Sequence, residues 1–309
     1  MKPSKVANSL LIAALMIAAW ILPLAHGAEP EKLNVCYSSI AATSVSTWIP
    51  KEAGIYQKYG LDVNTIYVSG AQAISTLISG DTHIVQGSGA AAVLSRLSGS
   101  DVTIIGTTIN VVPMSLVTTP DIGRVQDLKG KTFGVSRFGS LTDIGLRKAV
   151  SEFGLDPATD IKMIQTGGVP EILLFMQQGV IKGGLISSPT LEKAKELGYK
   201  ELLNLGEINY RYPGTALVTT GAFIKNRSQT LNRFLKATLE GIKYAKGNPD
   251  FTVRVLGKYT RNTDMKLLNS AFNSYVLGYI RDVPTVPTRD GIGIGRYCGA
   301  KSQGQDCRS

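Results

Sequence analysis

Glycine, serine and threonine residues cluster in short turns that follow apolar, strand-like runs. In the segment GVSRFGSLTD (134–143), Ser140 and Thr142 stand where an apolar run gives way to a helical pattern. A hydroxyl at this position can cap the helix, and the N–H groups of the same first turn can bind an anion. The turn is therefore either a structural cap or a cradle for a small anionic ligand, and one turn alone does not separate the two.

Turns of this kind recur along the chain. They contain Ser38, Ser39, Thr43 and Ser44; Gly70, Ala71 and Gln72; Gly87, Ser88 and Gly89; Gly139 to Thr142; Gly167 and Gly168; and Ser187 and Ser188. Each residue alone is more typical of a helix cap than of a ligand contact. Because helix N-termini and the carboxyl ends of parallel strands meet at one edge of a sheet, the whole set predicts a donor-rich, carboxylate-poor cleft.

Residues that support catalysis or metal binding are scarce. The chain has two histidines, and only His83 remains once the N-terminal segment described below is removed. We interpret His83 as a structural residue of a short strand, because one histidine cannot build a multi-histidine metal site. Of the three cysteines, Cys36 lies in an apolar run and is expected to be buried, whereas Cys298 and Cys307 could form a disulfide. We therefore expect no catalytic residue, no metal ion and no cofactor.

The N-terminus is typical of an exported protein. Two lysines precede an apolar run over residues 10–24, and small residues follow that run. The run is shorter than the roughly 20 residues that a transmembrane helix needs. Residues 1–27 are therefore predicted to be a signal peptide, cleaved near Gly27 or Ala28, which places the mature protein in the periplasm.

The charge of the chain is basic but dispersed. The formal net charge is +10, from 33 Lys and Arg residues against 23 Asp and Glu residues, and the basic residues form no run or stripe. A nucleic-acid-binding protein would show a clustered basic footprint. We therefore expect no nucleic-acid partner.

Apolar runs of strand length alternate with helical patterns along the rest of the chain. A first block predicts strands over residues 33–37, 62–68, 83–86 and 102–106, with helices over 45–59, 71–78 and 90–97. A second block predicts strands over 131–136, 161–165, 183–186 and 200–204, with helices over 141–153, 170–178 and 191–197. A strand over 215–220 and a mostly helical region to about residue 278 follow. Such alternation predicts an α/β protein with mostly parallel sheets flanked by helices.

The two blocks predict two lobes joined by two hinge crossings. We assign residues 28–118 and 215–285 to lobe 1 and residues 119–214 to lobe 2, so that a ligand cleft lies between them. Residues 286–309 form an atypical, glycine-rich C-terminal tail. This tail is either a genuine variable end or the product of a frameshift.

Four segments resemble a known family. They are PKEAGIYQKYGLDV (50–63), LISGDTHIVQGSG (77–89), DLKGKTFGVSRFGSLTD (127–143) and GLDPATDIKMIQTGGVPEILLFMQQGVIKGGLISSP (154–189). Their order and spacing are similar to those of the solute-binding proteins of nitrate/sulfonate/taurine-type ABC importers. The resemblance implies a two-lobed type II periplasmic binding protein fold. It also implies a monomer that clamps a small-molecule ligand and delivers it to an ABC permease, and so indirectly to the ATPase of that importer.

The resemblance also implies which residues contact the ligand. Its ligand-binding positions fall on Ser39, Thr43, Ser44, Gln72 and Ser88 in the first lobe, and on Ser140, Leu141, Thr142, Gly168 and Ser188 in the second lobe. Arg137 either supplies a charge to an anionic ligand or forms a salt bridge with Asp143. Trp48 either lines the pocket or packs in the core, and we favour the core.

The expected function is extracytoplasmic binding of a small anionic solute, such as a sulfonate, nitrate or carboxylate, without catalysis. The family also contains relatives that bind thiamine-precursor pyrimidines, so such a ligand is an alternative. An enzyme resembling the pyrimidine-synthesising branch and a ligand-binding subunit of a sensor are further alternatives.

Overall fold

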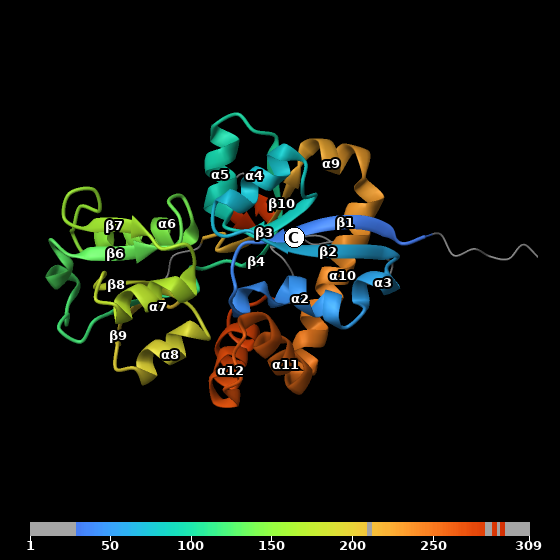
Figure 1. Ribbon diagram of the computed structural model, residues 1–309. Coiled ribbons are helices and arrows are strands. Elements are labelled where there is room, and N and C mark those ends of the chain that lie inside the picture. The colour runs from blue at the N-terminus through green and yellow to red at the C-terminus, as the bar shows by residue number, and fades with distance from the viewer. Residues whose placement is uncertain (1–28, 209–211, 282–285, 289–290, 294–309) are drawn as a thin grey trace, which may run out of the picture.

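The computed structural model describes residues 29–208, 212–281, 286–288 and 291–293, which form two α/β lobes side by side (Figure 1). The predicted signal peptide, Cys298, Cys307 and most of the predicted tail lie outside these residues. Within the described part of the chain, no helix is long and apolar enough to cross a membrane.

The first lobe is built on a five-stranded mixed sheet. Its strands, in spatial order, are β2 (Leu61–Tyr67), β1 (Glu31–Tyr37), β3 (Ile84–Gly87), β10 (Thr215–Thr220) and β4 (Val102–Ile109). Strand β1 is parallel to β2 and β3, whereas β10 is antiparallel to both β3 and β4.

The second lobe repeats this arrangement with different residues. Its strands, in spatial order, are β7 (Lys162–Gln165), β6 (Thr132–Val135), β8 (Gly183–Ile186), β5 (Ser115–Thr118) and β9 (Lys200–Asn204). In each lobe the antiparallel strand is the first one after the chain crosses from the other lobe. The strands joined through helices within a lobe are parallel, because a helical crossover returns the chain to the same end of the sheet.

Helices cover both sheets (Figure 1). The first lobe contains η1 (Ala42–Ser44), α2 (Val45–Glu52), α3 (Ile55–Lys58), α4 (Gln72–Ser79), α5 (Gly89–Leu97), α9 (Gly221–Asn226), α10 (Ser228–Gly247), α11 (Pro249–Thr260), α12 (Met265–Ala271) and the π-helical η3 (Phe272–Leu277). The second lobe contains η2 (Val125–Leu128), α6 (Leu141–Glu152), α7 (Val169–Gln177) and α8 (Thr190–Glu196). The predicted helix over 45–59 is split between α2 and α3, because Gly54 adopts a left-handed conformation with φ of 68°.

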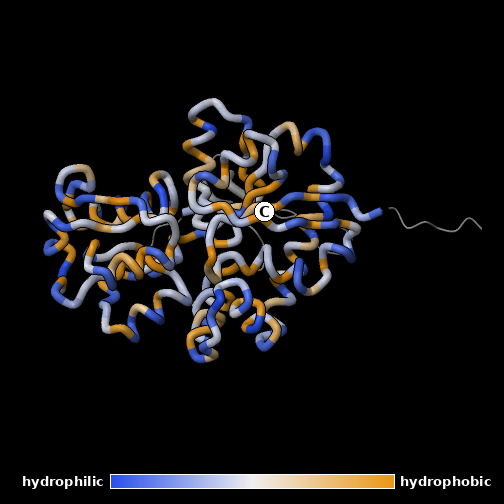
Figure 2. The backbone as a smooth tube through the Cα atoms, viewed as in Figure 1, coloured by the Kyte–Doolittle hydropathy of each residue, from blue (hydrophilic) through white to orange (hydrophobic). Residues whose placement is uncertain are grey.

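Each lobe has its own hydrophobic core, and hydrophobic segments run through both lobes in Figure 2. In the second lobe Phe133 and Leu185 pack with Leu146 and Ile172 from the covering helices. In the first lobe Trp48 is fully buried and stacks on Tyr259, with 4.5 Å between ring centroids. The core assignment of Trp48 is therefore confirmed.

The first crossing between lobes lies earlier than the predicted boundary at residues 118/119. Strand β5 pairs with β8 and β9 of the second sheet, so the chain leaves the first sheet between Ile109 and Ser115. The two crossings touch, because the Tyr212 N–H donates to the Asn110 carbonyl over 2.9 Å. The four-residue strand β5 was assigned to the wrong lobe because its sequence alone does not indicate which sheet it joins.

Part of the predicted tail forms a short hairpin. Strands β11 (Val286–Thr288) and β12 (Gly291–Gly293) pair antiparallel, and β11 contacts β4.

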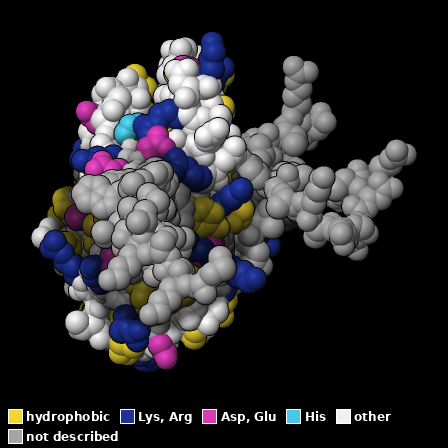
Figure 3. Space-filling view, turned by 90° about the vertical axis from the view of Figure 1, so that its right-hand side faces the viewer, with side chains coloured by type: hydrophobic (Ala, Val, Ile, Leu, Met, Phe, Trp, Pro, Cys, Tyr) yellow, Lys and Arg dark blue, Asp and Glu magenta, His cyan; other side chains and the backbone are white. Residues whose placement is uncertain are grey.

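On the face of the molecule shown in Figure 3, Lys and Arg side chains lie interspersed with Asp and Glu side chains.

Candidate functional site

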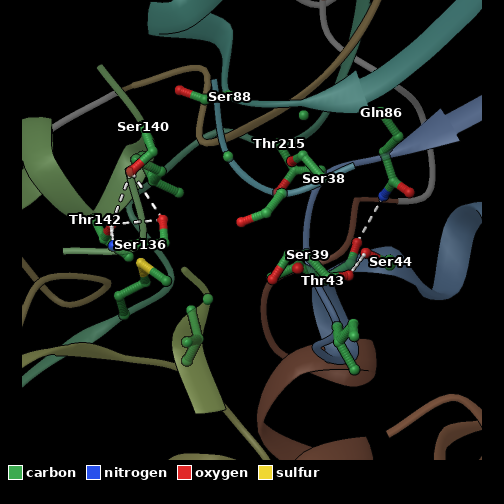
Figure 4. Close-up of a pocket in the computed structure, with 18 of the residues that line it drawn as sticks. Ser38, Ser39, Thr43, Ser44, Gln86, Ser88, Ser136, Ser140, Thr142 and Thr215 are labelled. Carbon is green, nitrogen blue, oxygen red and sulfur yellow. Dashed lines mark hydrogen bonds between the residues drawn. The ribbon is translucent and has the colours of Figure 1, made fainter. Parts of the chain in front are cut away.

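A pocket lies between the lobes, where the strands of both sheets end (Figure 4). The first lobe contributes Ser38, Ser39, Ile40, Thr43, Ser44, Tyr67, Ser69, Gly70, Gln86, Gly87, Ser88 and Thr215. The second lobe and the crossings contribute Pro113, Met114, Ser136, Ser140, Leu141, Thr142, Gly168, Val169 and Gly214. We call this set the cleft pocket. Its cavity of about 50 Å³ has room for roughly three to five water-sized groups, so it suits a small head group.

Eight of the eleven predicted ligand-binding residues line the cleft pocket. They are Ser39, Thr43, Ser44, Ser88, Ser140, Leu141, Thr142 and Gly168. The other three, Gln72, Arg137 and Ser188, are not among its lining residues. Gln72 is exposed on the first turn of α4. Ser188 is fully buried, and its hydroxyl donates to Glu192.

Arg137 does not form the predicted salt bridge with Asp143, whereas its role as a charge for an anionic ligand stays a prediction. Asp143 pairs instead with Arg147, over 2.7 Å, and accepts a hydrogen bond from the Gly139 N–H over 2.8 Å. The side chain of Arg137 lies across the cleft against Gly70 of the first lobe. Asp143 and Arg147 are four residues apart on α6, a spacing at which two side chains meet on one helix face.

Three hydroxyls form a triangle on the second-lobe wall of the cleft pocket (Figure 4). The Ser136 oxygen lies 3.0 Å from that of Ser140 and 2.9 Å from that of Thr142, and the last two lie 2.8 Å apart. Thr142 also accepts the Ser136 N–H over 2.8 Å. Ser140 occupies the N-cap position of α6, but its side chain accepts no capping hydrogen bond from the described residues.

The serines at the N-cap positions of α5 and α6 differ in their hydrogen bonds. Ser88 is a true cap of α5, because its hydroxyl accepts the Ala91 N–H over 3.4 Å. Ser140 leaves the first N–H groups of α6 without a capping side chain. Such N–H groups have no partner within their own helix and are available to a bound ligand.

The lining of the cleft pocket is polar but carries no charged side chain among its described residues. Its described lining residues include no Asp, Glu, Lys, Arg or His. Lining residues stand at the N-terminal ends of α5, α6 and α7, where the helix dipole is positive. Burial raises the pKa of Tyr67, so its phenol stays neutral and can donate a hydrogen bond.

Gln86 was missed by the sequence reasoning, and it organises the first-lobe wall. It is buried in β3, and its Nε2 donates to the Thr43 carbonyl over 2.7 Å and to the Ser46 hydroxyl over 2.8 Å. Its Oε1 accepts from the Thr47 hydroxyl over 2.5 Å. The sequence signal that could have indicated this role is a glutamine within the apolar strand IVQG (84–87). A buried side-chain amide requires hydrogen-bond partners, so it is expected to organise the polar groups around it.

Direct contacts join the lobes around the cleft pocket. The Ser69 hydroxyl donates to the Gly167 carbonyl, and the Ala42 N–H donates to the Ser188 carbonyl over 3.2 Å. Gly70 approaches Arg137 so closely that an added Cβ would lie 2.9 Å from the Arg137 Cγ. The conformation seen here is therefore one in which the two lobes touch across the cleft.

His83 and Cys36 lie away from the cleft pocket, as their predicted structural roles require. The Nδ1 of His83 accepts the Asn34 N–H over 2.9 Å. Cys36 is fully buried in β1, and burial raises the pKa of its thiol to about 11. Among the described residues, no group of three His, Cys, Asp or Glu side chains is placed to hold a metal ion.

Solved structures of other proteins share this fold. The alkanesulfonate-binding protein SsuA from Xanthomonas axonopodis pv. citri, solved with bound MOPS, is 14% identical with a TM-score of 0.70, covering 82% of this chain and 86% of that one. The periplasmic nitrate-binding protein NrtA from Synechocystis PCC 6803 is 13% identical with a TM-score of 0.68, covering 77% and 69%. The desulfurization enzyme DSZB is 13% identical with a TM-score of 0.58, covering 81% and 86%.

These matches confirm the predicted type II periplasmic binding protein fold. The sheets were predicted to be mostly parallel, and each is mixed, with one antiparallel strand. A comparison with curated protein sequences gives no match. A family model described as NMT1/THI5 like matches residues 45–252. Because this match spans more than half of the chain, the protein belongs to the NMT1/THI5-like family.

Proposed function

We propose that this protein is an extracytoplasmic solute-binding protein that holds a small anionic head group in the cleft pocket and delivers it to an ABC importer. The observation that carries the proposal is the convergence of the N-termini of α5, α6 and α7 with a set of hydroxyls on one small cavity. Backbone N–H groups at helix N-termini stabilise negative charge even where no cationic side chain is present. A sulfonate, nitrate or carboxylate group fits this chemistry.

The proposed ligand contacts are the eight predicted residues that line the cleft pocket, together with Ser136 in the hydroxyl triangle. Each lobe supplies part of the set, so a bound ligand favours the conformation in which the lobes touch. Closure also excludes water, which strengthens each hydrogen bond to the ligand.

Binding without catalysis is the proposed role of these residues. A serine or threonine acts as a nucleophile when a neighbouring base activates it. The described residues that line the pocket include no Asp, Glu, His, Lys or Arg side chain that could act as this base. Because the enzyme DSZB shares the fold, the fold itself does not argue for either role, and the proposal rests on the composition of the pocket.

A thermal-shift screen of the mature protein tests the proposal. The panel contains methanesulfonate, taurine, nitrate, benzoate and a hydroxymethylpyrimidine. A ligand at about 100 times its Kd stabilises the folded state by about 2.7 kcal/mol, which raises the Tm by roughly 5–10 °C for a chain of this size. We expect at least one anion to produce such a shift and the pyrimidine to produce none.

Two controls make the screen decisive. Ser140→Ala should reduce the shift, whereas Ser98→Ala, at an exposed serine on the C-cap of α5, should leave it unchanged. Small-angle scattering should show a more compact protein with the anion bound. A shift caused by the pyrimidine alone would instead support the thiamine-precursor alternative, and turnover of any probe would overturn the binding role.

A further inference from the structure

A second hollow adjoins the cleft pocket and is larger and mainly apolar. It lies between α7 and α8 of the second lobe and faces the turn after β1 in the first lobe. Its apolar lining consists of Ile40, Pro170, Leu173, Leu174, Pro189 and Leu197. We call it the trough, and its cavity of about 290 Å³ compares with about 50 Å³ in the cleft pocket.

The trough and the cleft pocket share a wall. Ile40 lines both of them, and on the opposite side Val169 lines the cleft pocket while the next residue, Pro170, lines the trough. The two hollows are therefore neighbours at Ile40 and at the junction of Val169 and Pro170. No other residue stands in both linings.

The turn that carries Ile40 is held in place from both lobes. The Ser44 hydroxyl donates to the Ser39 carbonyl over 2.7 Å, which fixes the turn to the start of α2. The Ala42 N–H donates to the Ser188 carbonyl across the cleft. The partition formed by Ile40 is therefore a defined feature of the touching lobes.

The apolar surface in the trough is large for residues beside a polar pocket. Leu174 is 52% exposed and Leu197 is 44% exposed, although both lie beside the buried Leu173. Covering such side chains with an apolar group removes their surface from water, which is favourable in proportion to the area covered. The small cavity of the cleft pocket leaves the remainder of any larger ligand outside it.

We propose that the ligand is an anion with an apolar substituent, whose head group occupies the cleft pocket and whose substituent passes Ile40 into the trough. This inference rests on the proposed function and makes it more specific. It predicts that a bare ion such as nitrate binds more weakly than an organic sulfonate or carboxylate. The residues of the trough would then determine the length of substituent that is accepted.

Calorimetric titration with straight-chain alkanesulfonates, from methanesulfonate to octanesulfonate, and with the matched alkanoates tests the inference. Each methylene placed in the trough should raise the affinity by about fourfold, until the trough is filled and the affinity becomes constant. The double variant Leu174→Ser/Leu197→Ser should bind methanesulfonate normally but lose most of the gain from chain length.

The double variant Leu94→Ser/Leu97→Ser is a matched control. Leu94 and Leu97 are 49% and 79% exposed on α5 and do not line the trough, so this variant should retain the full dependence on chain length. Binding of methanesulfonate with no gain along either series would overturn the inference and leave the proposed function intact. A gain that persists in the trough variant would also overturn it. Failure of every sulfonate and carboxylate to bind would refute the proposed function itself, and the inference with it.

Discussion

Two residues of the hydroxyl triangle, Ser140 and Thr142, are expected to differ in how much they contribute to ligand binding and to folding. Among the described residues, the Ser140 hydroxyl forms hydrogen bonds with the hydroxyls of Ser136 and Thr142 and with no backbone group. Thr142 has a further partner, because it accepts the buried Ser136 N–H over 2.8 Å. We therefore predict that Ser140→Ala mainly weakens binding, whereas Thr142→Val weakens both binding and folding.

The expected magnitudes differ enough to be measured. A hydrogen bond from Ser140 to a charged ligand is worth about 1.5–3 kcal/mol, so Ser140→Ala should lower the affinity for methanesulfonate by roughly 10- to 150-fold. The same change removes only hydroxyl–hydroxyl bonds from the ligand-free protein, at about 0.5–1.5 kcal/mol. Thr142→Val keeps the shape of the side chain but leaves the Ser136 N–H buried without a partner, at about 1–3 kcal/mol of stability.

Two measurements on the same variants check this reasoning. Calorimetric titration with methanesulfonate gives the change in affinity, and urea unfolding without ligand gives the change in the free energy of unfolding. The reasoning fails if Ser140→Ala binds within twofold of the unmodified protein. It also fails if Ser140→Ala lowers the free energy of unfolding as much as Thr142→Val does.

Two further predictions concern closure and pH. Gly70→Ala places a Cβ 2.9 Å from the Arg137 Cγ across the cleft, so the affinity for methanesulfonate should fall by at least about tenfold. Gly80 also has a positive φ, of 83° against 61° at Gly70, but has open space around it, so Gly80→Ala should lose a similar stability and keep its affinity. Equal affinities of the two variants would contradict this account. Burial and the nearby charge of Arg227 lower the pKa of His83 below its usual 6.5, so the unfolded chain binds the proton more readily than the folded protein. The free energy of unfolding should therefore fall as the pH falls below about 6.5. Urea unfolding between pH 7 and pH 5 should show a smaller fall for His83→Gln than for the unmodified protein. An equal fall in both proteins would contradict this account.

The elements of the fold were largely predictable because they follow from local patterns. Nearly every predicted strand and helix of the two blocks has a counterpart within one to three residues of its expected position, and the strand over 183–186 matches β8 at both ends. The strand that the sequence did not predict depends on contacts distant in sequence. Strand β5 is only four residues long, and its membership of the second sheet is decided by pairing with β8 and β9.

The sequence by itself determined that hydroxyl-rich turns would gather at one cleft. Parallel strands joined through helices bring their carboxyl ends to one edge, so residues such as Ser88 and Ser140 reach the same pocket from different lobes. The sequence did not determine which of these residues line the cleft pocket. Ser188 also follows a strand, but it is buried outside the pocket.

Only the tertiary structure decided the partners of the polar groups. The sequence left open whether Ser140 caps a helix, and in the structure its hydroxyl completes the hydroxyl triangle. Gln86 joins β3 to the residues around the start of α2. Arg137 reaches across the cleft to Gly70 instead of pairing with Asp143. Side-chain hydrogen bonds and ion pairs act over a few ångströms and need defined geometry, so they depend on how the lobes pack. Local sequence patterns specify the helices and strands, whereas these contacts exist only once distant segments have been brought together.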